Sequence, residues 1–393
     1  MSQTKIRVGV VGAGLRFALM RAIIELPNSA FHLVAVADPS SAARDTVNAE
    51  LPGVRVYDHH RELVADPDVD AIFVLTPDFL HAEVGLASLA GGKATFIEKP
   101  LATSLEDADA LIEAARRTGA LLYVGHNMRQ MPLVEKMREV VESGAIGEPR
   151  AFWIRHFIGR GGDYFFKDWH AEKARSGGLL VHKGSHDLDA MAHILGTRYV
   201  SVQGSGGLTV YDGAHRRELD APAPDARSHI DNWPPLAQRN LNPALDVEDL
   251  SHVNLVCENG VLGTYMQCHY TPDYWRNYCI IGTEGRAENF GDEGGDGVIR
   301  VWTTRRRGYD PEPDIEIRLS EDAATQDGHD GADLRILQNF ADSYLGRAEP
   351  LTSIDAARNA VAVGQIAGAS IDGDGRMLTV PVAASLTGGR RDG

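Results

Sequence analysis

The first 127 residues alternate between short apolar segments rich in β-branched residues and longer segments with helical periodicity. The strand-like segments are residues 6–11, 31–37, 69–75, 94–99 and 120–125. Parallel strands need such crossovers, so the alternation predicts an α/β fold with a doubly wound parallel sheet. Ligands of these sheets bind at the carboxyl ends of the strands, and the residues that follow each strand therefore carry the functional information.

The first strand leads into the loop Gly12-Ala13-Gly14-Leu15-Arg16-Phe17-Ala18, and a helical pattern follows from Leu19 to Leu26. Strand, glycine turn and helix form the context of a dinucleotide-binding loop. Gly12 permits a tight turn, and Gly14 lets the backbone approach a pyrophosphate at the helix N-terminus. The third glycine of the fingerprint is missing, and a plain strand-to-helix turn is the alternative.

Asp38 ends the second strand, about 20 residues beyond the glycine loop, where the fingerprint places its acidic residue. A carboxylate there accepts hydrogen bonds from both ribose hydroxyls and repels a 2′-phosphate. We therefore predict NAD, in preference to NADP, as the cofactor. The alternative is that Asp38 only caps the helix predicted from Ser40 to Leu51.

A later strand ends in Glu98-Lys99-Pro100. Proline has no N–H for a central ladder, so the strand stops there and Lys99 lies at the ligand-binding edge. Thr76-Pro77-Asp78, with His81 in the helix beyond, and His126-Asn127 follow neighbouring strands at the same edge.

Beyond about residue 150 the pattern changes to long strands, which predicts a second domain with a large, mainly antiparallel open sheet. The 393 residues exceed one typical core, so we expect an NAD-binding domain over 1–127 and a substrate-binding and oligomerisation domain over 128–383. Two helices, 332–345 and 353–370, are expected to fold back on the first domain, and 384–393 to form a flexible tail. The Pro- and Asp-rich insertion 204–245 is long enough to be a lid or a subunit arm, and its role is open.

In the second domain, Gly177-Gly178 precedes a predicted helix on which His182 and His186 would share one face. Histidines at this spacing can bind zinc, but the intervening Lys183 would repel a cation, so we predict no metal site. A buried core histidine is the alternative for His186.

Together these motifs resemble those of the Gfo/Idh/MocA family of sugar and cyclitol oxidoreductases, over most of the chain. The resemblance includes Gly144 to Pro149 and the family's Gly-Gly…Asp-x-Gly-x-His-x-x-Asp signature, in which His186 takes the place of the catalytic histidine. It implies that Lys99 lies between the nicotinamide and the substrate hydroxyl, and that a cis bond can precede Pro100. His182 stands where many members have aspartate, which is a departure from the inositol dehydrogenase proton relay.

The motifs and the resemblance together define the expected site. The catalytic residues are Lys99, His186 and His182. The cofactor contacts are Gly12, Ala13, Gly14, Arg16, Phe17, Asp38, Thr76, Pro77, His81, Glu98, Lys99, Asn127 and Trp169. The substrate contacts are Lys99, Arg155, His170, Lys183, His186 and Tyr274; for Tyr274 a core aromatic role is the alternative.

The expected reaction is hydride transfer between NAD and a secondary hydroxyl or keto group of a sugar, sugar derivative or cyclitol. A histidine with a pKa near 6.5 can take the hydroxyl proton while the Lys99 ammonium stabilises the oxygen. Two alternatives stay open. One is an NAD-dependent glycosidase that works by transient oxidation, elimination, water addition and re-reduction. The other is a non-catalytic NAD-sensing regulator, against which the presence of Lys99 and His186 argues.

Composition narrows the range of partners. A formal net charge of −16 argues against nucleic acid or an anionic membrane as the main partner and favours a small molecule. No signal-peptide pattern or apolar run near 18 residues occurs, so we expect a cytoplasmic protein. The three cysteines, Cys257, Cys268 and Cys279, lack metal-site spacing and should be buried free thiols. An open sheet needs covering, which predicts a homodimer or homotetramer.

Overall fold

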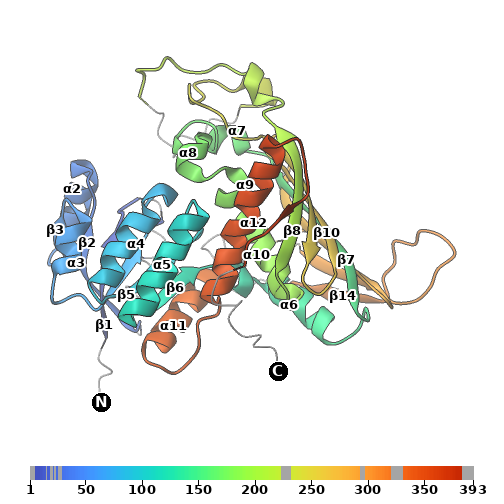
Figure 1. Ribbon diagram of the computed structural model, residues 1–393, viewed down its shortest axis with the longest axis horizontal. Helices are drawn as coiled ribbons and strands as arrows, with labels where there is room; N and C mark the ends of the chain where they lie inside the picture. Colours follow the sequence, from blue (N-terminus) through green and yellow to red (C-terminus); the bar gives the residue numbers. More distant parts are fainter. Residues whose placement is uncertain are drawn as a thin grey trace. The chain divides into compact units, whose positions relative to one another are not determined.

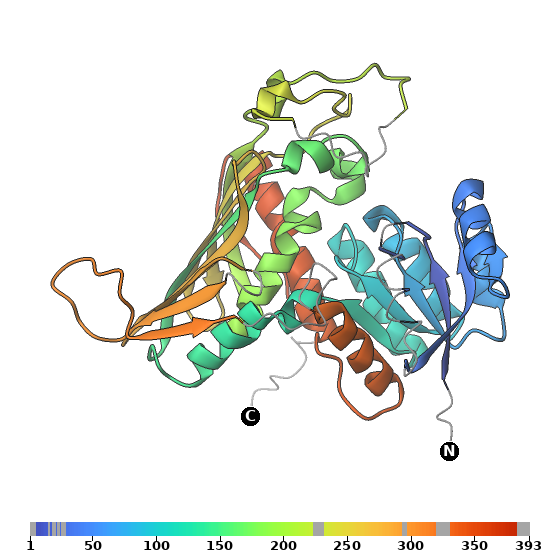
Figure 2. The same cartoon turned by 180° about the vertical axis from the view of Figure 1, so that it is seen from behind.

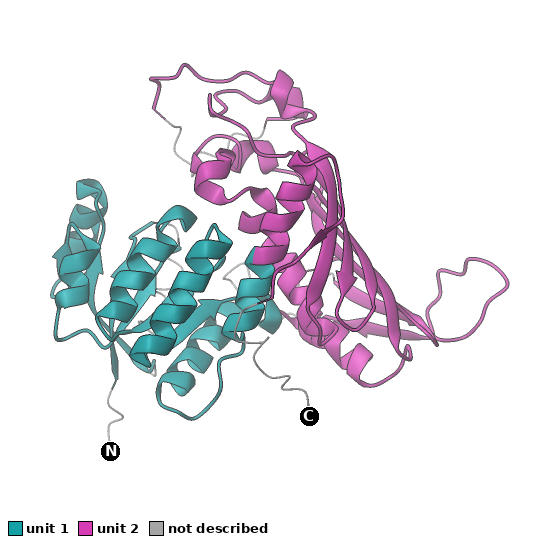
Figure 3. Ribbon diagram, in the orientation of Figure 1, with its two compact units in different colours: residues 1–130, 326–361 teal, residues 131–325, 362–393 magenta. Residues whose placement is uncertain are grey.

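The computed structural model describes residues 5–14, 16, 17, 21, 24, 29–222, 232–292, 297–319 and 331–382. The chain divides into two compact units, 1–130 with 326–361 and 131–325 with 362–393 (Figure 3). Most of the helix predicted from Leu19 to Leu26, part of the 204–245 insertion and the tail 384–393 lie outside the described residues.

Unit 1 contains a six-stranded parallel sheet, which confirms the predicted doubly wound arrangement (Figure 1). Its strand order is β3-β2-β1-β4-β5-β6. The strands are β1 (Ile6–Val11), β2 (Phe31–Ala37), β3 (Arg55–Tyr57), β4 (Ala71–Val74), β5 (Ala94–Glu98) and β6 (Leu122–Gly125). The chain winds outward from β1 to one side and then from β4 to the other. The loops after β1 and β4 therefore meet at the switch point where such sheets bind ligands.

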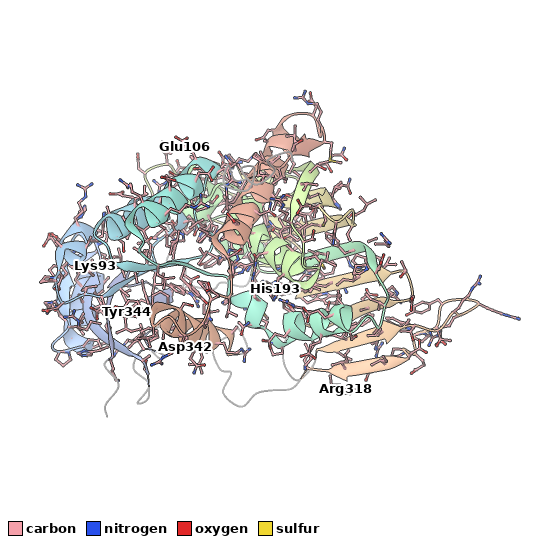
Figure 4. All side chains as sticks on the ribbon, turned by 60° about the horizontal axis from the view of Figure 1, so that its bottom comes forward. Lys93, Glu106, His193, Arg318, Asp342 and Tyr344 are labelled. Atoms are coloured by element: carbon pink, nitrogen blue, oxygen red, sulfur yellow. The ribbon has the colours of Figure 1, made fainter. Side chains whose placement is uncertain are left out.

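Helices cover both faces of this sheet. They are α2 (Ser41–Glu50), α3 (His60–Ala65), α4 (His81–Ala90), which follows the short η1 (Asp78–Leu80), α5 (Leu105–Thr118) and α11 (Ala332–Tyr344). Successive strand residues point to opposite faces. Ile97 therefore packs under Gly85 of α4, whereas Phe96 faces Phe340 of α11, with ring centroids 5.8 Å apart. Lys93, labelled in Figure 4, precedes β5 and donates to the carbonyls of Asp66 and Val69 at 2.9 and 2.7 Å.

Unit 2 contains a nine-stranded sheet in the order β14-β13-β12-β11-β7-β10-β9-β8-β15 (Figure 2). The strands are β7 (Pro149–Ile158), β8 (Tyr199–Gly207), β9 (Leu250–Cys257), β10 (Leu262–Cys268), β11 (Tyr274–Gly282), β12 (Arg286–Phe290), β13 (Val298–Trp302), β14 (Ile315–Arg318) and β15 (Leu378–Thr379). Every pair is antiparallel except β7 with β10, so the predicted mainly antiparallel sheet is confirmed.

Helical segments precede β8 in unit 2. They are α6 (Pro132–Glu142), α7 (Gly161–Tyr164), η3 (Trp169–Ala171), α8 (Lys173–Ser176), α9 (Leu179–His182) and α10 (Gly184–Ile194), and α12 (Ile354–Asp372) continues from unit 1 into unit 2. Among the segments that precede β8, α6, α9 and α10 contact the sheet. The Tyr199 hydroxyl of β8 donates to the Leu188 carbonyl of α10 at 2.9 Å, which ties the helix to the sheet.

The prediction of one helix carrying both His182 and His186 is wrong. His182 ends α9 and His186 lies in the first turn of α10, with Lys183 between them at φ −108° and ψ −44°. Gly184 has low helix propensity, and a Cβ there would lie 3.2 Å from the Tyr265 ring of β10. Packing against the sheet therefore decides where the helix breaks.

The three cysteines are buried free thiols, as predicted. Burial raises the pKa of Cys257 and of Cys279 to about 12, so neither thiol is a reactive thiolate at neutral pH. Within the described ranges, we find no helix with the length and apolar character that crossing a membrane requires.

Candidate functional site

The glycine loop after β1 packs tightly against the end of β4. Gly12 has φ +99°, and a Cβ at this position would lie 2.7 Å from the Leu75 carbonyl oxygen, so only glycine fits. Gly14 faces open space instead, and its backbone is accessible to a ligand. The loop therefore has the tight turn and the open approach that a pyrophosphate requires.

Asp38 holds this loop in place. Its Oδ2 accepts from the Ala13 backbone N–H at 2.8 Å, and its Oδ1 accepts from the Ser40 N–H at 2.8 Å. Ser40, not Asp38, is the N-cap of α2, because its Oγ accepts from Ala43, so the capping alternative for Asp38 is wrong. Each carboxylate oxygen keeps a further acceptor position. Asp38 thus fits a ribose diol while it positions the loop.

His81 joins two loops of the edge. Its Nδ1 lies 2.7 Å from the Pro100 carbonyl oxygen and its Nε2 lies 3.1 Å from that of Thr76. The residue is 1% exposed, and the Lys99–Pro100 bond that follows β5 is cis, as the resemblance implied. Both ring nitrogens thus face backbone carbonyls, which gives His81 a positioning role. Lys99 itself is half-buried at this edge.

Arg16, Glu98 and Asn127 meet in one ion-pair cluster, which we call the Arg16 cluster. Arg16 donates from Nε to Glu98 at 2.8 Å and from both terminal nitrogens to Asp333 at 2.6 and 2.7 Å. Asn127 donates to Asp333 at 2.9 Å. Burial lowers the pKa of Arg16, but the charges of Glu98 and Asp333 outweigh it and raise that pKa overall, so Arg16 stays charged.

Asp333 was not among the predicted site residues, since its only signal in the sequence is an acid in the first turn of a predicted helix. Phe17 was predicted to contact the cofactor. The structure packs Phe17 in the core of unit 1, where it is 6% exposed.

In unit 2, a second charged cluster surrounds Asp187 on α10, and we call it the Asp187 cluster. His156 Nδ1 lies 2.7 Å from Asp187 Oδ2, and both side chains are fully buried. Tyr278 and Tyr265 donate to the same carboxylate at 2.6 and 3.2 Å, and Arg276 Nε lies 3.1 Å from it.

The protonation states within the Asp187 cluster follow from burial and charge. Burial lowers the pKa of His156 to about 4 despite the nearby carboxylate, so a neutral ring donates from Nδ1. Burial raises the pKa of Asp187, but His156 and Arg276 outweigh it and hold that pKa well below its usual range. The carboxylate is therefore ionised at every ordinary pH.

The rings of the predicted residues Trp169, His170 and His182 pack together, with Trp169 stacked on His170 and the His182 ring edge-on to both. Trp169 and His170 lie 3.8 Å apart between ring centroids, and His170 and His182 lie 4.9 Å apart. The Phe165 ring packs on this group, with its centroid 5.6 Å from that of His182 and 5.7 Å from that of His170. His186 is 6% exposed, one turn further along the chain.

Phe165 also borders a cavity of about 600 Å³ that brings Lys183 and Tyr274 together. Its lining residues are Ile158, Gly159, Arg160, Tyr164, Phe165, Lys183, Trp233, Pro272, Asp273 and Tyr274. Arg160 and Trp233 were not among the predicted site residues.

The structure does not bring Arg155 to this cavity. Arg155 donates to Asn277 Oδ1 at 2.8 and 2.6 Å, on the sheet face opposite to His156. Neighbouring residues of a strand point to opposite sides, so Arg155 does not line this cavity.

Two family models match the chain. The first, an oxidoreductase family with an NAD-binding Rossmann fold, matches residues 6–126, and the second, the GFO/IDH/MocA C-terminal domain, matches residues 134–288. The chain belongs to the Gfo/Idh/MocA oxidoreductase family. The parallel sheet of unit 1 is the NAD-binding Rossmann fold of this family.

Relatives of this Gfo/Idh/MocA protein include two named dehydrogenases. A 1-carboxy-3-chloro-3,4-dihydroxycyclohexa-1,5-diene dehydrogenase of Comamonas testosteroni is 30% identical over 54% of this chain, and the match spans about half (52%) of the relative's length. A scyllo-inositol 2-dehydrogenase (NAD(+)) of Bacillus subtilis is 26% identical over 83% of each chain. The crystal structure of an NAD binding oxidoreductase from Klebsiella pneumoniae shares the fold, with a TM-score of 0.77 at 21% identity over 96% of this chain and 100% of that one.

Proposed function

We propose that this protein is an NAD-dependent dehydrogenase or ketoreductase acting on a secondary hydroxyl or keto group of a sugar, sugar derivative or cyclitol. The observation that carries the proposal is the position of Lys99. Its half-buried ammonium follows β5 at the sheet edge where Gly14 is open and Asp38 holds the glycine loop. A cation at that edge can stabilise an oxygen whose charge develops during the reaction. The inositol and dihydroxycyclohexadiene dehydrogenases among the relatives support this substrate class.

In the proposed mechanism, bound NAD supplies the hydride acceptor, and the chain supplies position and proton transfer. Lys99 stabilises the substrate oxygen as it becomes a carbonyl. His186 takes the hydroxyl proton, and its 6% exposure limits competition from water. His182, which packs on His170, orients the base or the substrate.

A panel of polyols and cyclitols with NAD, followed by NADH absorbance, tests the proposal. Lys99→Ala and His186→Ala should each lower turnover by about 10²-fold or more and leave NAD affinity nearly unchanged. Lys136→Met, which alters an exposed helix pair with Glu139, is the control and should keep wild-type turnover. Wild-type turnover in His186→Ala would show that the base lies elsewhere.

The same panel with aryl glycosides separates the other two functions. Aglycone release without net NADH would replace the dehydrogenase with redox-neutral glycoside cleavage. NAD binding without turnover of any compound would favour a regulator.

We also propose a homodimer or homotetramer that forms through the exposed face of the unit 2 sheet. Trp153, Phe157 and Trp275 lie half-buried on β7 and β11, and Leu262 of β10 is 57% exposed. Such an apolar sheet face is usually covered. A monomeric mass in light scattering would refute this assembly.

A further inference from the structure

The cavity of unit 2 contains positive charge that the protein itself does not neutralise. Lys183 is half-buried, and its Nζ lies 5.7 and 5.9 Å from the ring centroids of Phe165 and Tyr274. Among the described residues, no carboxylate pairs with Lys183 or with Arg160, the second cation of the lining. Ring faces compensate a partly desolvated ammonium only in part, because water and carboxylates bind it more strongly.

Tyr274 provides a second sign of this positive charge. Arg276 donates to the Tyr274 hydroxyl at 3.3 Å from behind the cavity wall. Burial raises the pKa of Tyr274, yet Arg276 and Lys183 outweigh it and lower that pKa overall. Arg276 is itself balanced by Asp187 and Asp292, at 3.1 and 3.4 Å, so Lys183 is the unbalanced partner.

The remaining lining suits a ring-shaped molecule. Tyr164, Phe165, Trp233 and Tyr274 supply aromatic surface, and about 600 Å³ is the size of a pocket for one small ligand. Asp273 is the one carboxylate of the lining, and it is exposed to solvent. In a chain of net charge −16, a cavity lined by two cations and one exposed acid is a local reversal of sign.

We propose that this cavity binds a hydroxylated ring that carries an oxyanion group, a carboxylate or a phosphate, and that Lys183 is the residue that selects it. That such a compound is also the substrate rests on the proposed dehydrogenase function. The binding preference of the cavity does not depend on that function. Arg160 adds a second, more exposed contact for the anion.

Matched compounds test the preference. We would compare a neutral hexose, its uronic acid and its 6-phosphate for NADH formation, and measure the binding of each by calorimetry in the presence of NAD. One of the two anionic compounds should exceed the neutral sugar by about 10- to 100-fold in kcat/KM and in affinity, the range expected for a charge-assisted contact. Which anion wins distinguishes a sugar acid from a sugar phosphate.

Lys183→Met removes the charge and keeps the length of the side chain. It should abolish the preference, chiefly through a higher KM for the anionic compound, so that the anionic and neutral compounds bind alike. Arg160→Gln should reduce the preference less, and Lys136→Met on exposed α6 should not change it. A preference that weakens with added salt in the wild type, but not in Lys183→Met, would support the assignment further.

Equal binding of neutral and anionic rings, no binding of either anion, or a preference that survives in Lys183→Met would overturn the inference. Tight, Lys183-dependent binding of an anion without NADH formation would uphold the inference and refute the proposed dehydrogenase function.

Discussion

The Arg16 cluster of unit 1 and the Asp187 cluster of unit 2 stabilise a buried charge in opposite ways. In the first, one cation lies between two carboxylates, Glu98 and Asp333. In the second, one carboxylate accepts from two tyrosines and a neutral histidine beside Arg276. The Arg16 side chain is 19% exposed, whereas that of Asp187 is fully buried.

The difference shows where each unit is vulnerable. Arg16 keeps one acid if the other is removed, because Glu98 and Asp333 come from different elements. His156 and Tyr278 both lose their acceptor if the Asp187 carboxylate is removed. We therefore expect the loss of an acid to lower the free energy of unfolding more in the Asp187 cluster than in the Arg16 cluster. In both clusters, protein groups replace the water that would otherwise solvate the charges.

Asp187→Ala is expected to have the largest effect. It leaves Arg276 with only the more distant Asp292 and removes the acceptor of Tyr278 and His156, so the free energy of unfolding should fall by about 3–5 kcal/mol. Urea denaturation followed by fluorescence measures the change. Asp212→Ala, which breaks an exposed pair with Arg216, is the control and should cost less than about 1 kcal/mol. Similar values for the two variants would contradict the comparison.

Acid should destabilise the protein through His156. Between pH 6.5 and about 4 this histidine is protonated in the unfolded chain but not in the folded chain. Its contribution to the free energy of unfolding is therefore fully present above pH 6.5 and is lost as the pH falls. The lowered pKa of His156 corresponds to a loss of about 3 kcal/mol in the free energy of unfolding. Unfolding at a series of pH values measures it, and His156→Gln should flatten the curve in this window. If the curve of His156→Gln is unaltered, another group causes the loss of stability between pH 6.5 and 4. Arg16 is not that group, because its charge does not change in this range.

Asp333→Asn should have a smaller effect than Asp187→Ala. It removes one of two acids around Arg16 while Glu98 remains, so we expect a loss of about 1–3 kcal/mol. Asp342→Asn is the matched control on the same helix (Figure 4), where an exposed pair with Arg347 spans 3.7 Å. A loss as large as that of Asp187→Ala would show that Glu98 cannot hold Arg16 alone.

Asp38→Ala should have the smallest effect, and it acts on cofactor choice. The wild type should bind NAD well above NADP, and the variant should lose about tenfold of that preference, because the ribose diol and the Ala13 N–H lose their shared carboxylate. Calorimetric titration with both nucleotides measures it, and Asp45→Ala on the exposed side of α2 is the control. Equal affinities of the wild type for NAD and NADP would show that Asp38 does not select the cofactor.

Local patterns in the sequence are sufficient to predict the strands, the helices and the sheet edge at which the candidate site lies. Hydrophobic periodicity defines the strands and helices, and local rules place Gly12, Asp38 and Lys99 at strand ends. These features depend on neighbours in the chain, and Gly12 at φ +99° and the stop at Pro100 are cases in which one residue type decides the backbone.

Which side chains meet depends on contacts between residues that are far apart in the chain. Asp333 reaches Arg16 across 317 positions, and the β7–β11 register sets His156 opposite Arg276. The same register turns Arg155 away from the cavity, because a shift of one residue reverses the face of a strand. Lys183 occupies the break between α9 and α10 because Gly184 packs on β10. Such contacts depend on long-range packing and register, which the local pattern of residues does not contain.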